Sequence, residues 1–402
     1  MIILFFVLLF SVKNFAEEPI IKSLHVYKNS DVTVLPVINQ NSSDKLTISF
    51  DIEAEHEPDF NIIFKFCDEN WKPYDNLLLE RIGETEFRNV YVEKLPITTE
   101  GAQYSVKESF PKENIKFSNS GKWMFFITDS FDDDYVYEFG KFYVVENMVN
   151  LKTNIQNWRR EGRISDNNAN DRVLNLSTKF AISDSLEPFR IDHIEIVKNF
   201  ETSYPIILNK DSFVKNRGFE WDGARNFEFV IRDLEPGNEY RQTNLKNQNK
   251  YQYPITRAQF EGFDYSRFYQ LGKKDFNGGF KLMDSRNEYS DYIIATFEFK
   301  PPNRTDEDIF IVGSFTNWEV LPWFKLNNEN DLYNISLELK RGTYDYQYVT
   351  GTINNDFVED INWFIFEGNF YETENVYSVF LYYKSPEKGE YDKIIGYKQI
   401  VR

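Results

Sequence analysis

The chain has 402 residues, which is too long for one typical hydrophobic core and predicts two to four domains. Phe, Tyr and Trp make up 17% of the residues, and this enrichment favours β-strands. With 64 acidic and 46 basic residues the formal net charge is −18, which disfavours contact with nucleic acids and with anionic membrane surfaces. The single cysteine, Cys67, excludes an intramolecular disulfide and a cysteine-based metal site.

The N-terminus has the pattern of an export signal. The apolar run from Ile2 to Phe10 is too short to span a bilayer as a helix, and Ala16 stands where a signal peptidase would cleave. No cysteine follows the run, so a lipid anchor is not indicated. We therefore predict a signal peptide over residues 1–16 and an exported protein that is soluble once the peptide is removed.

Residues 17–147 predict an N-terminal β-sandwich. Leu46 to Ile52 alternates strictly between apolar and polar residues, which is typical of a half-buried antiparallel strand. Further strands are expected at Gly121 to Ile127 and Tyr135 to Val145, with an Asp-rich turn between them. Cys67 ends the strand-like run from Ile62, so we expect its thiol to be buried.

Residues 148–286 and 287–402 predict a middle and a C-terminal β-sandwich. Expected strands of the middle block are residues 174–182, 189–197 and 227–231, and those of the last block are 292–299, 309–313, 333–339, 343–349 and 376–383. The fold class is therefore all-β, with three consecutive immunoglobulin-like sandwich domains.

The sequence offers little for catalysis. Its three histidines, His25, His56 and His193, stand in separate contexts, and the apolar alternation around His193 predicts that its side chain faces solvent. The run from Asp132 to Asp134 could ligate calcium, but it lacks the spacing of a calcium loop, and a solvated hairpin turn is the favoured interpretation. We expect no catalytic residue, no cofactor and no metal site, although 64 acids leave a glycosidase pair open.

One local motif resembles the glycogen-binding, early-set type of immunoglobulin-like module. It runs from Gly313 to Trp318, continues at Trp323, and is followed by the segment 342–349. The resemblance implies an early-set-like C-terminal sandwich. It also makes Trp318, Trp323 and Trp363 candidates for stacking on a sugar or touching a partner, although Trp318 could equally be a core residue.

Several segments together resemble the Plug protein family of the type IX secretion system of Bacteroidota and relatives. They are Phe66 to Trp71, Gly237 to Arg241, Asp275 to Phe280, Ser290 to Tyr292, Glu367 to Tyr377 and Tyr391 to Gly396. Their order and spacing match the family from about residue 21 to residue 397.

The resemblance implies a non-enzymatic role at the inner, periplasmic face of the outer membrane. The partner would be the large translocon barrel of the SprA/Sov type, whose pore the protein seals while no cargo shuttle is bound. No small-molecule substrate is expected. Two other hypotheses stay open: a secreted carbohydrate-binding protein, and a glycoside hydrolase whose carboxylate pair is not recognisable from the sequence.

Overall fold

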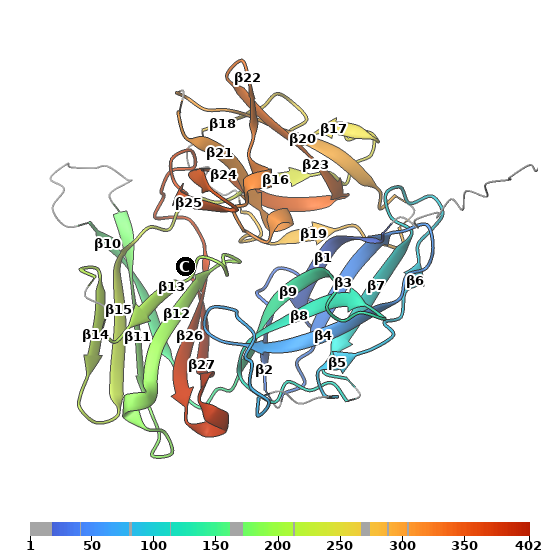
Figure 1. Cartoon of the computed structure of the whole chain (residues 1–402). Coiled ribbons are helices and arrows are strands. Elements are labelled where there is room, and N and C mark those ends of the chain that lie inside the picture. The colour runs from blue at the N-terminus through green and yellow to red at the C-terminus, as the bar shows by residue number, and fades with distance from the viewer. Residues whose placement is uncertain are drawn as a thin grey trace, which may run out of the picture.

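The computed structural model describes residues 18–402, apart from residues 41, 80–82, 113, 161–171, 212–213, 267–273, 288 and 304. The predicted signal peptide, residues 1–16, lies outside the described residues. The described residues form strands and short 3₁₀ turns, which confirms the all-β fold class (Figure 1). Across the described part of the chain, no helix has the length and apolar character needed to cross a membrane.

The first sandwich packs two antiparallel-rich sheets, in the orders β1-β3-β7-β6 and β2-β9-β8-β4-β5. Phe50 from one sheet and Phe64 and Phe125 from the other are among the side chains that fill its core. The strands are β1 Ile20–Lys28, β2 Val37–Asn39, β3 Leu46–Glu53, β4 Phe60–Cys67, β5 Glu86–Phe87, β6 Glu93–Lys94, β7 Tyr104–Phe110, β8 Gly121–Asp129 and β9 Val136–Val145.

The second sandwich combines strands from the middle of the chain with its last two strands. Its sheets have the orders β10-β11-β15-β14 and β13-β12-β26-β27, and their facing apolar side chains form one core. The strands are β10 Lys152–Arg159, β11 Arg172–Ala181, β12 Ile191–Lys198, β13 Ile206–Asn209, β14 Arg217–Trp221, β15 Asn226–Leu234, β26 Val376–Ser385 and β27 Tyr391–Val401, with 3₁₀ turns η2 Pro188–Arg190 and η5 Glu387–Gly389.

The third sandwich is formed by the chain between β15 and β26. One sheet has the order β16-β24-β19, with β21 and β25 also paired to β24, and the other has the order β17-β20-β23-β22, with β18 beside β20. The strands are β16 Arg241–Asn244, β17 Ile255–Arg257, β18 Asp264–Tyr265, β19 Phe280–Leu282, β20 Tyr292–Lys300, β21 Asp308–Gly313, β22 Asn327–Glu329, β23 Leu332–Lys340, β24 Gly342–Asn354 and β25 Phe357–Asn362, with 3₁₀ turns η3 Ser314–Thr316 and η4 Pro322–Phe324.

The strands therefore group differently from the consecutive order expected from the sequence. Strand β26, expected in the block 287–402, pairs antiparallel with β12, with Ile196 opposite Val379. Strands β16 and β19, which the sequence did not predict and whose residues lie in the block 148–286, pair with β24 of the third sandwich. Figure 1 shows the red strands β26 and β27 in the same body as the green β12, while the yellow and orange strands form a separate upper body. Alternation identifies a strand, but it does not say which sheet edge the strand joins.

Candidate functional site

The first and second sandwiches are joined by an ion pair that is shielded from solvent. Lys122 of β8 places its Nζ 2.7 Å from Oε2 of Glu195 on β12, and the two side chains are 2% and 0% exposed. The same Nζ donates to the carbonyl of Glu69 at 2.7 Å, and the Tyr143 hydroxyl donates to the other Glu195 oxygen at 3.0 Å. Every strong acceptor and donor of the pair thus has a partner, which is the condition under which a buried ion pair is tolerated.

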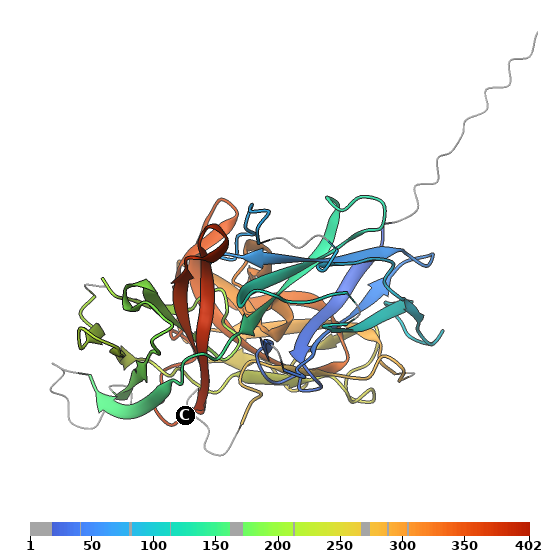
Figure 2. The ribbon, with the colours of Figure 1, turned by 90° about the horizontal axis from the view of Figure 1, so that it is seen from below.

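Aromatic rings surround this ion pair and complete the contact. Tyr143 of β9 stacks on Phe380 of β26 with ring centroids 4.3 Å apart, and Trp71 packs edge-on against Tyr143 at 5.0 Å. The ammonium of Lys122 lies 4.8 Å from the centre of the Trp71 ring. A separate hydrophobic cluster with members from both sandwiches lies here, and in the view from below the red strands lie between the green and the blue bodies (Figure 2).

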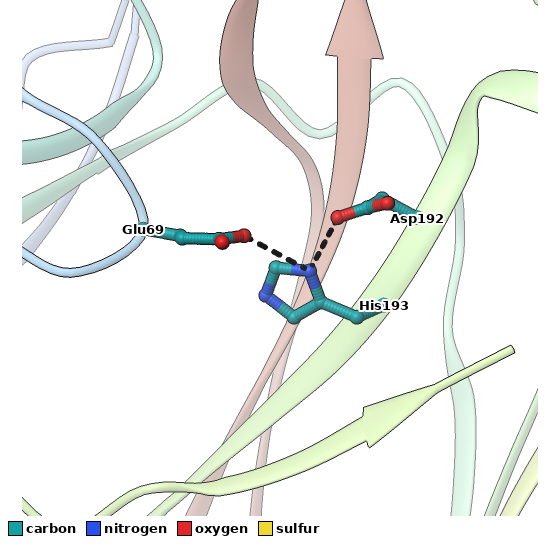
Figure 3. Close-up of side chains that lie close together, drawn as sticks. All are labelled: Glu69, Asp192 and His193. Atoms are coloured by element: carbon teal, nitrogen blue, oxygen red, sulfur yellow. Dashed lines mark hydrogen bonds and ion pairs between the residues drawn. The ribbon is translucent and has the colours of Figure 1, made fainter. Parts of the chain in front are cut away.

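At the edge of this contact, His193 meets two carboxylates (Figure 3). Its Nδ1 lies 2.8 Å from Asp192 Oδ2 and 3.8 Å from Glu69 Oε2, which belongs to the first sandwich. The ring is buried and stacks on Tyr382 at 4.3 Å, so the prediction that His193 faces solvent is wrong. The neighbouring sandwich covers the outer face of the sheet, which alternation along one strand does not reveal.

The geometry of this cluster is compatible with a metal ligand set, because the three ligand atoms lie within 4.8 Å of one another. A cation of the chain itself is already there: Lys384 Nζ lies 3.6 Å from Glu69 Oε2 and 3.8 Å from Asp192 Oδ2, and it pairs with Asp392. Burial alone would raise the pKa of Asp192, but the hydrogen bond from His193 and the charge of Lys384 hold it below its usual value. The carboxylates are therefore charge-compensated, and the cluster acts as an ionic clamp between sandwiches.

An open pocket of about 380 Å³ adjoins the clamp and mixes both signs of charge. It is lined by Glu69, Asp192, Asn209, Lys210, Asp211 and Lys384. A glycosidase pair needs one protonated carboxyl and one free carboxylate facing a sugar. Here Lys384 Nζ lies within ion-pair distance of both Glu69 and Asp192, so the two carboxylates of this pocket share one cation of the chain.

A second buried ion pair joins the first and third sandwiches. Lys340 of β23 lies 2.5 Å from Asp51 Oδ2 on β3, and the side chains are 2% and 4% exposed. The Tyr292 hydroxyl donates to the same carboxylate at 2.9 Å, and the Tyr292 backbone N–H donates to the carbonyl of Glu100 at 2.9 Å. Close by, His25 stacks on Phe280 with centroids 3.8 Å apart, and burial lowers the pKa of His25 to about 4.

All three sandwiches meet at Glu319. Its Oε1 accepts from Lys141 Nζ of the first sandwich at 2.8 Å and from the Ser203 hydroxyl of the second at 2.7 Å. Next to this junction, the Tyr204 hydroxyl of the second sandwich accepts from the Val320 backbone N–H of the third at 3.0 Å. The three bodies thus contact one another pairwise, so that hinging of one sandwich against a second is opposed by its contacts to the third.

The segments that carry the Plug resemblance lie at these contacts, or form hydrogen bonds where the chain passes between the second and third sandwiches. Phe66 packs its ring 5.6 Å from Tyr391, which joins two of the segments across the first and second sandwiches, and Tyr74, just after the first segment, donates to Asp392 at 2.7 Å. The segment 237–241 is bound to the segment 367–377 by hydrogen bonds, among them Phe370 N–H to the Gly237 carbonyl at 2.7 Å.

The three candidate tryptophans have different surroundings. Trp318 is 1% exposed, packs 4.1 Å from Tyr240, and donates its Nε1–H to the Gly278 carbonyl at 2.7 Å. Trp363 is half-buried against Tyr204, and Trp323 is exposed. A buried Trp318 presents no ring face to a sugar, so the three rings do not form one stacking surface.

Comparison with known protein families gives a match for the first sandwich. Residues 21–146 match the family model described as the type 9 secretion system plug protein 1st domain. The first domain of this chain belongs to the type IX secretion plug family. This match supports a role of the chain in type IX secretion, and the matched range agrees with the first sandwich.

The fold of the whole chain is also found in a solved structure. A crystal structure of a hypothetical protein from Parabacteroides merdae superposes with a TM-score of 0.77 at 19% sequence identity. The match covers 96% of this chain and 98% of the other, so the three-sandwich architecture as a whole is shared. Among curated proteins, no match is found.

Sequence reasoning missed the charged residues at the contacts. Glu195 and Asp51 each stand between two apolar neighbours in a strand, which predicts the solvent face of a sandwich, and Lys122 precedes a continuous apolar run. What they share is a charged residue within an apolar strand. This pattern is compatible with an outer sheet face that another domain covers as well as with a face exposed to solvent.

Proposed function

We propose that this protein is a non-enzymatic plug of the type IX secretion translocon. In this proposal it binds the periplasmic mouth of the large outer-membrane barrel of the SprA/Sov type and seals the pore while no cargo shuttle occupies it. Membership of the plug family supports the role in secretion. The sealing role is supported by the physical form of the molecule.

The observation that carries the proposal is the set of three contacts between the sandwiches. A stopper in a wide pore must keep its shape, because a body that hinges opens a leak. Tandem sandwiches on flexible linkers move relative to one another by default. Here buried ion pairs join the first sandwich to the second and to the third, and Glu319 contacts both of its neighbours. A single stiff body wider than one sandwich is the result.

The surface also suits a partner that is bound and later released. Large apolar side chains stay exposed on each sandwich, for example Phe131, Phe189 and Trp323. Aromatic anchors of this kind are enriched in protein interfaces, and a stable seal would bury on the order of 1,200–2,000 Å². The net charge of −18 keeps the released form soluble.

Co-purification from native membranes tests the binding step. We expect the full chain, captured through an affinity tag, to recover an outer-membrane barrel protein of well over a hundred kilodaltons. Recovery of no barrel protein under conditions that keep the translocon intact would refute the proposal. The Lys179→Met variant, altered at an exposed ion pair on the second sandwich, is the matched control and should recover the barrel like the unaltered chain.

Permeability tests the sealing step. Deleting the gene should let a large hydrophilic antibiotic, normally excluded by the outer membrane, enter the source bacterium, and the intact chain should restore exclusion. A variant that loosens the contact between the first and second sandwiches, Lys122→Met, should bind the barrel yet restore exclusion poorly. Unchanged uptake after deletion would show that the pore is closed by something else.

A further inference from the structure

A cluster of arginines lies at one end of the second sandwich, in a protein whose net charge is −18. An open pocket of about 530 Å³ is found there, and we call it the arginine pocket. It is lined by Asn157, Trp158, Arg159, Arg160, Arg172 and Tyr371. Arg402, at the end of the other sheet, reaches its edge, where the guanidinium donates to the Tyr371 carbonyl at 3.1 Å and to Asn157.

The register of the sheet places two of these arginines side by side. Arg159, the last residue of β10, is directly opposite Arg172, the first residue of β11. Two residues further along, Leu174 packs in the core, so both arginines extend from the core-facing side where the two sheets part. Like charges directly opposite each other on neighbouring strands destabilise a sheet.

Tyr371 holds one of the guanidinium groups in place. The Cζ of Arg172 lies 4.3 Å from the centre of the Tyr371 ring, and the Tyr371 hydroxyl donates to Glu372 at 2.7 Å. Within the described ranges, Arg160 forms an ion pair with Glu235, whereas none is found for Arg159, Arg172 or Arg402. Glu372 and Glu235 therefore each contact a residue that lines this pocket.

We propose that the arginine pocket binds a ligand that carries a phosphate group. Guanidinium groups recognise oxyanions through paired N–H donors, and three of them from different elements can share the several oxygens of one phosphate. A carboxylate has only two oxygens and is satisfied by one arginine. The half-exposed Trp158 adds an aromatic surface beside the charged groups, and a bound anion would offset the repulsion between Arg159 and Arg172.

Titration calorimetry of the full chain with inorganic phosphate, at low ionic strength, tests the site. We expect saturable binding that is at least tenfold tighter than the binding of acetate. Arg172→Gln should weaken phosphate binding at least tenfold, and Arg172→Lys should keep part of it. Arg257→Gln, which alters an exposed arginine paired with Glu298 in the third sandwich, is the matched control and should bind like the unaltered chain. Equal binding of phosphate and acetate, or an unchanged Arg172→Gln, would overturn the proposal.

Vesicles distinguish the two sources of the phosphate. If the natural ligand is a lipid headgroup, the chain should float with vesicles of phosphatidylglycerol and phosphatidylcholine, but not with phosphatidylcholine alone, and Arg172→Gln should abolish flotation. If phosphate binds and no vesicle does, the ligand is a soluble phosphate compound. Should Arg172→Gln fail to fold, as judged by its melting curve, Arg159→Gln tests the same site from an exposed position. Failure of phosphate to bind would leave the sealing proposal untouched, since that rests on the contacts between the sandwiches.

Discussion

Replacing Lys122 by Met tests whether the contact between the first and second sandwiches depends on its ion pair. The substitution keeps an unbranched side chain of similar size and removes the ammonium group. It leaves Glu195, which is 0% exposed, with a hydrogen bond from Tyr143 but no cation at Oε2. It also removes the donor to the Glu69 carbonyl and the cation above the Trp71 ring.

The expected cost follows from leaving a charge uncompensated in the interior. Breaking a buried ion pair by removing one partner costs about 3–5 kcal/mol, whereas replacing both partners by apolar residues is often close to neutral. The double variant Lys122→Met with Glu195→Leu should therefore be more stable than Lys122→Met alone. Its remaining cost should be about 1–3 kcal/mol, because the Tyr143 hydroxyl loses its acceptor.

Urea denaturation followed by tryptophan fluorescence measures these differences. Trp71 packs on Tyr143 at this contact, so the opening of the contact contributes to the change in emission of the seven tryptophans. The matched control is Lys179→Met: Lys179 pairs with Glu228 on the surface of the second sandwich, and its side chain is 63% exposed. An exposed pair of this kind contributes about 1 kcal/mol or less. If Lys122→Met costs no more than this control, or if the double variant is less stable than Lys122→Met, the assignment of the contact to the ion pair is refuted.

Three further predictions concern single side chains. Trp318→Ala should lower the free energy of unfolding by about 3–5 kcal/mol because it leaves a cavity in the core. Trp323→Ala, at an exposed position, should change this free energy by about 0.5 kcal/mol or less. Equal effects of the two substitutions in thermal or urea unfolding would contradict the assignment of Trp318 to the core. Burial raises the pKa of the Cys67 thiol to about 12. The native protein at pH 8 should therefore react with a chromogenic disulfide reagent at least tenfold more slowly than the unfolded chain does. A native protein that reacts as fast as the unfolded chain would contradict the burial of this thiol. Burial lowers the pKa of His25 from 6.5 to about 4, so between these pH values the unfolded chain binds a proton that the folded chain does not. The free energy of unfolding should therefore fall between pH 6.5 and pH 4 by up to about 1.4 kcal/mol per pH unit, relative to the His25→Gln variant. Identical pH profiles of the two proteins would show that His25 stays accessible to solvent.

The sequence predicts the long, strongly alternating strands but not short ones such as β13 and β16. The alternation from Leu46 to Ile52 predicts a strand, and β3 runs from Leu46 to Glu53. The strand expected at residues 376–383 is β26, Val376–Ser385. What the pattern could not supply is the partner of that strand: β26 lies beside β12, with Ile196 opposite Val379, and the chain between them builds the whole third sandwich. Pairing across such a distance depends on the completed fold and not on any window of residues.

The candidate site was beyond reach of the sequence for a related reason. A charged residue in an amphipathic strand is expected in water, and one sandwich alone would place Lys122 and His193 there. The outer face becomes interior only when a second sandwich covers it, as Glu195 and Glu69 show by meeting these two side chains from the other body. The information lies in the contact between domains, which hydrophobic periodicity does not encode.

Charged contacts of this kind explain how the three bodies can be fixed in one arrangement. An apolar contact tolerates sliding, because neighbouring apolar surfaces are nearly equivalent. A buried ion pair tolerates none, since a shift that separates Lys340 from Asp51 leaves both charges without compensation. With one such pair on each flank of the first sandwich and Glu319 bridging all three bodies, the arrangement is determined at three separate points. The segments that carry the plug resemblance contribute Trp71 and Asp392 to the contact between the first and second sandwiches and Tyr292 to that between the first and third. These segments therefore help to fix the relative positions of the three sandwiches, and a fixed shape is what the proposed sealing role requires.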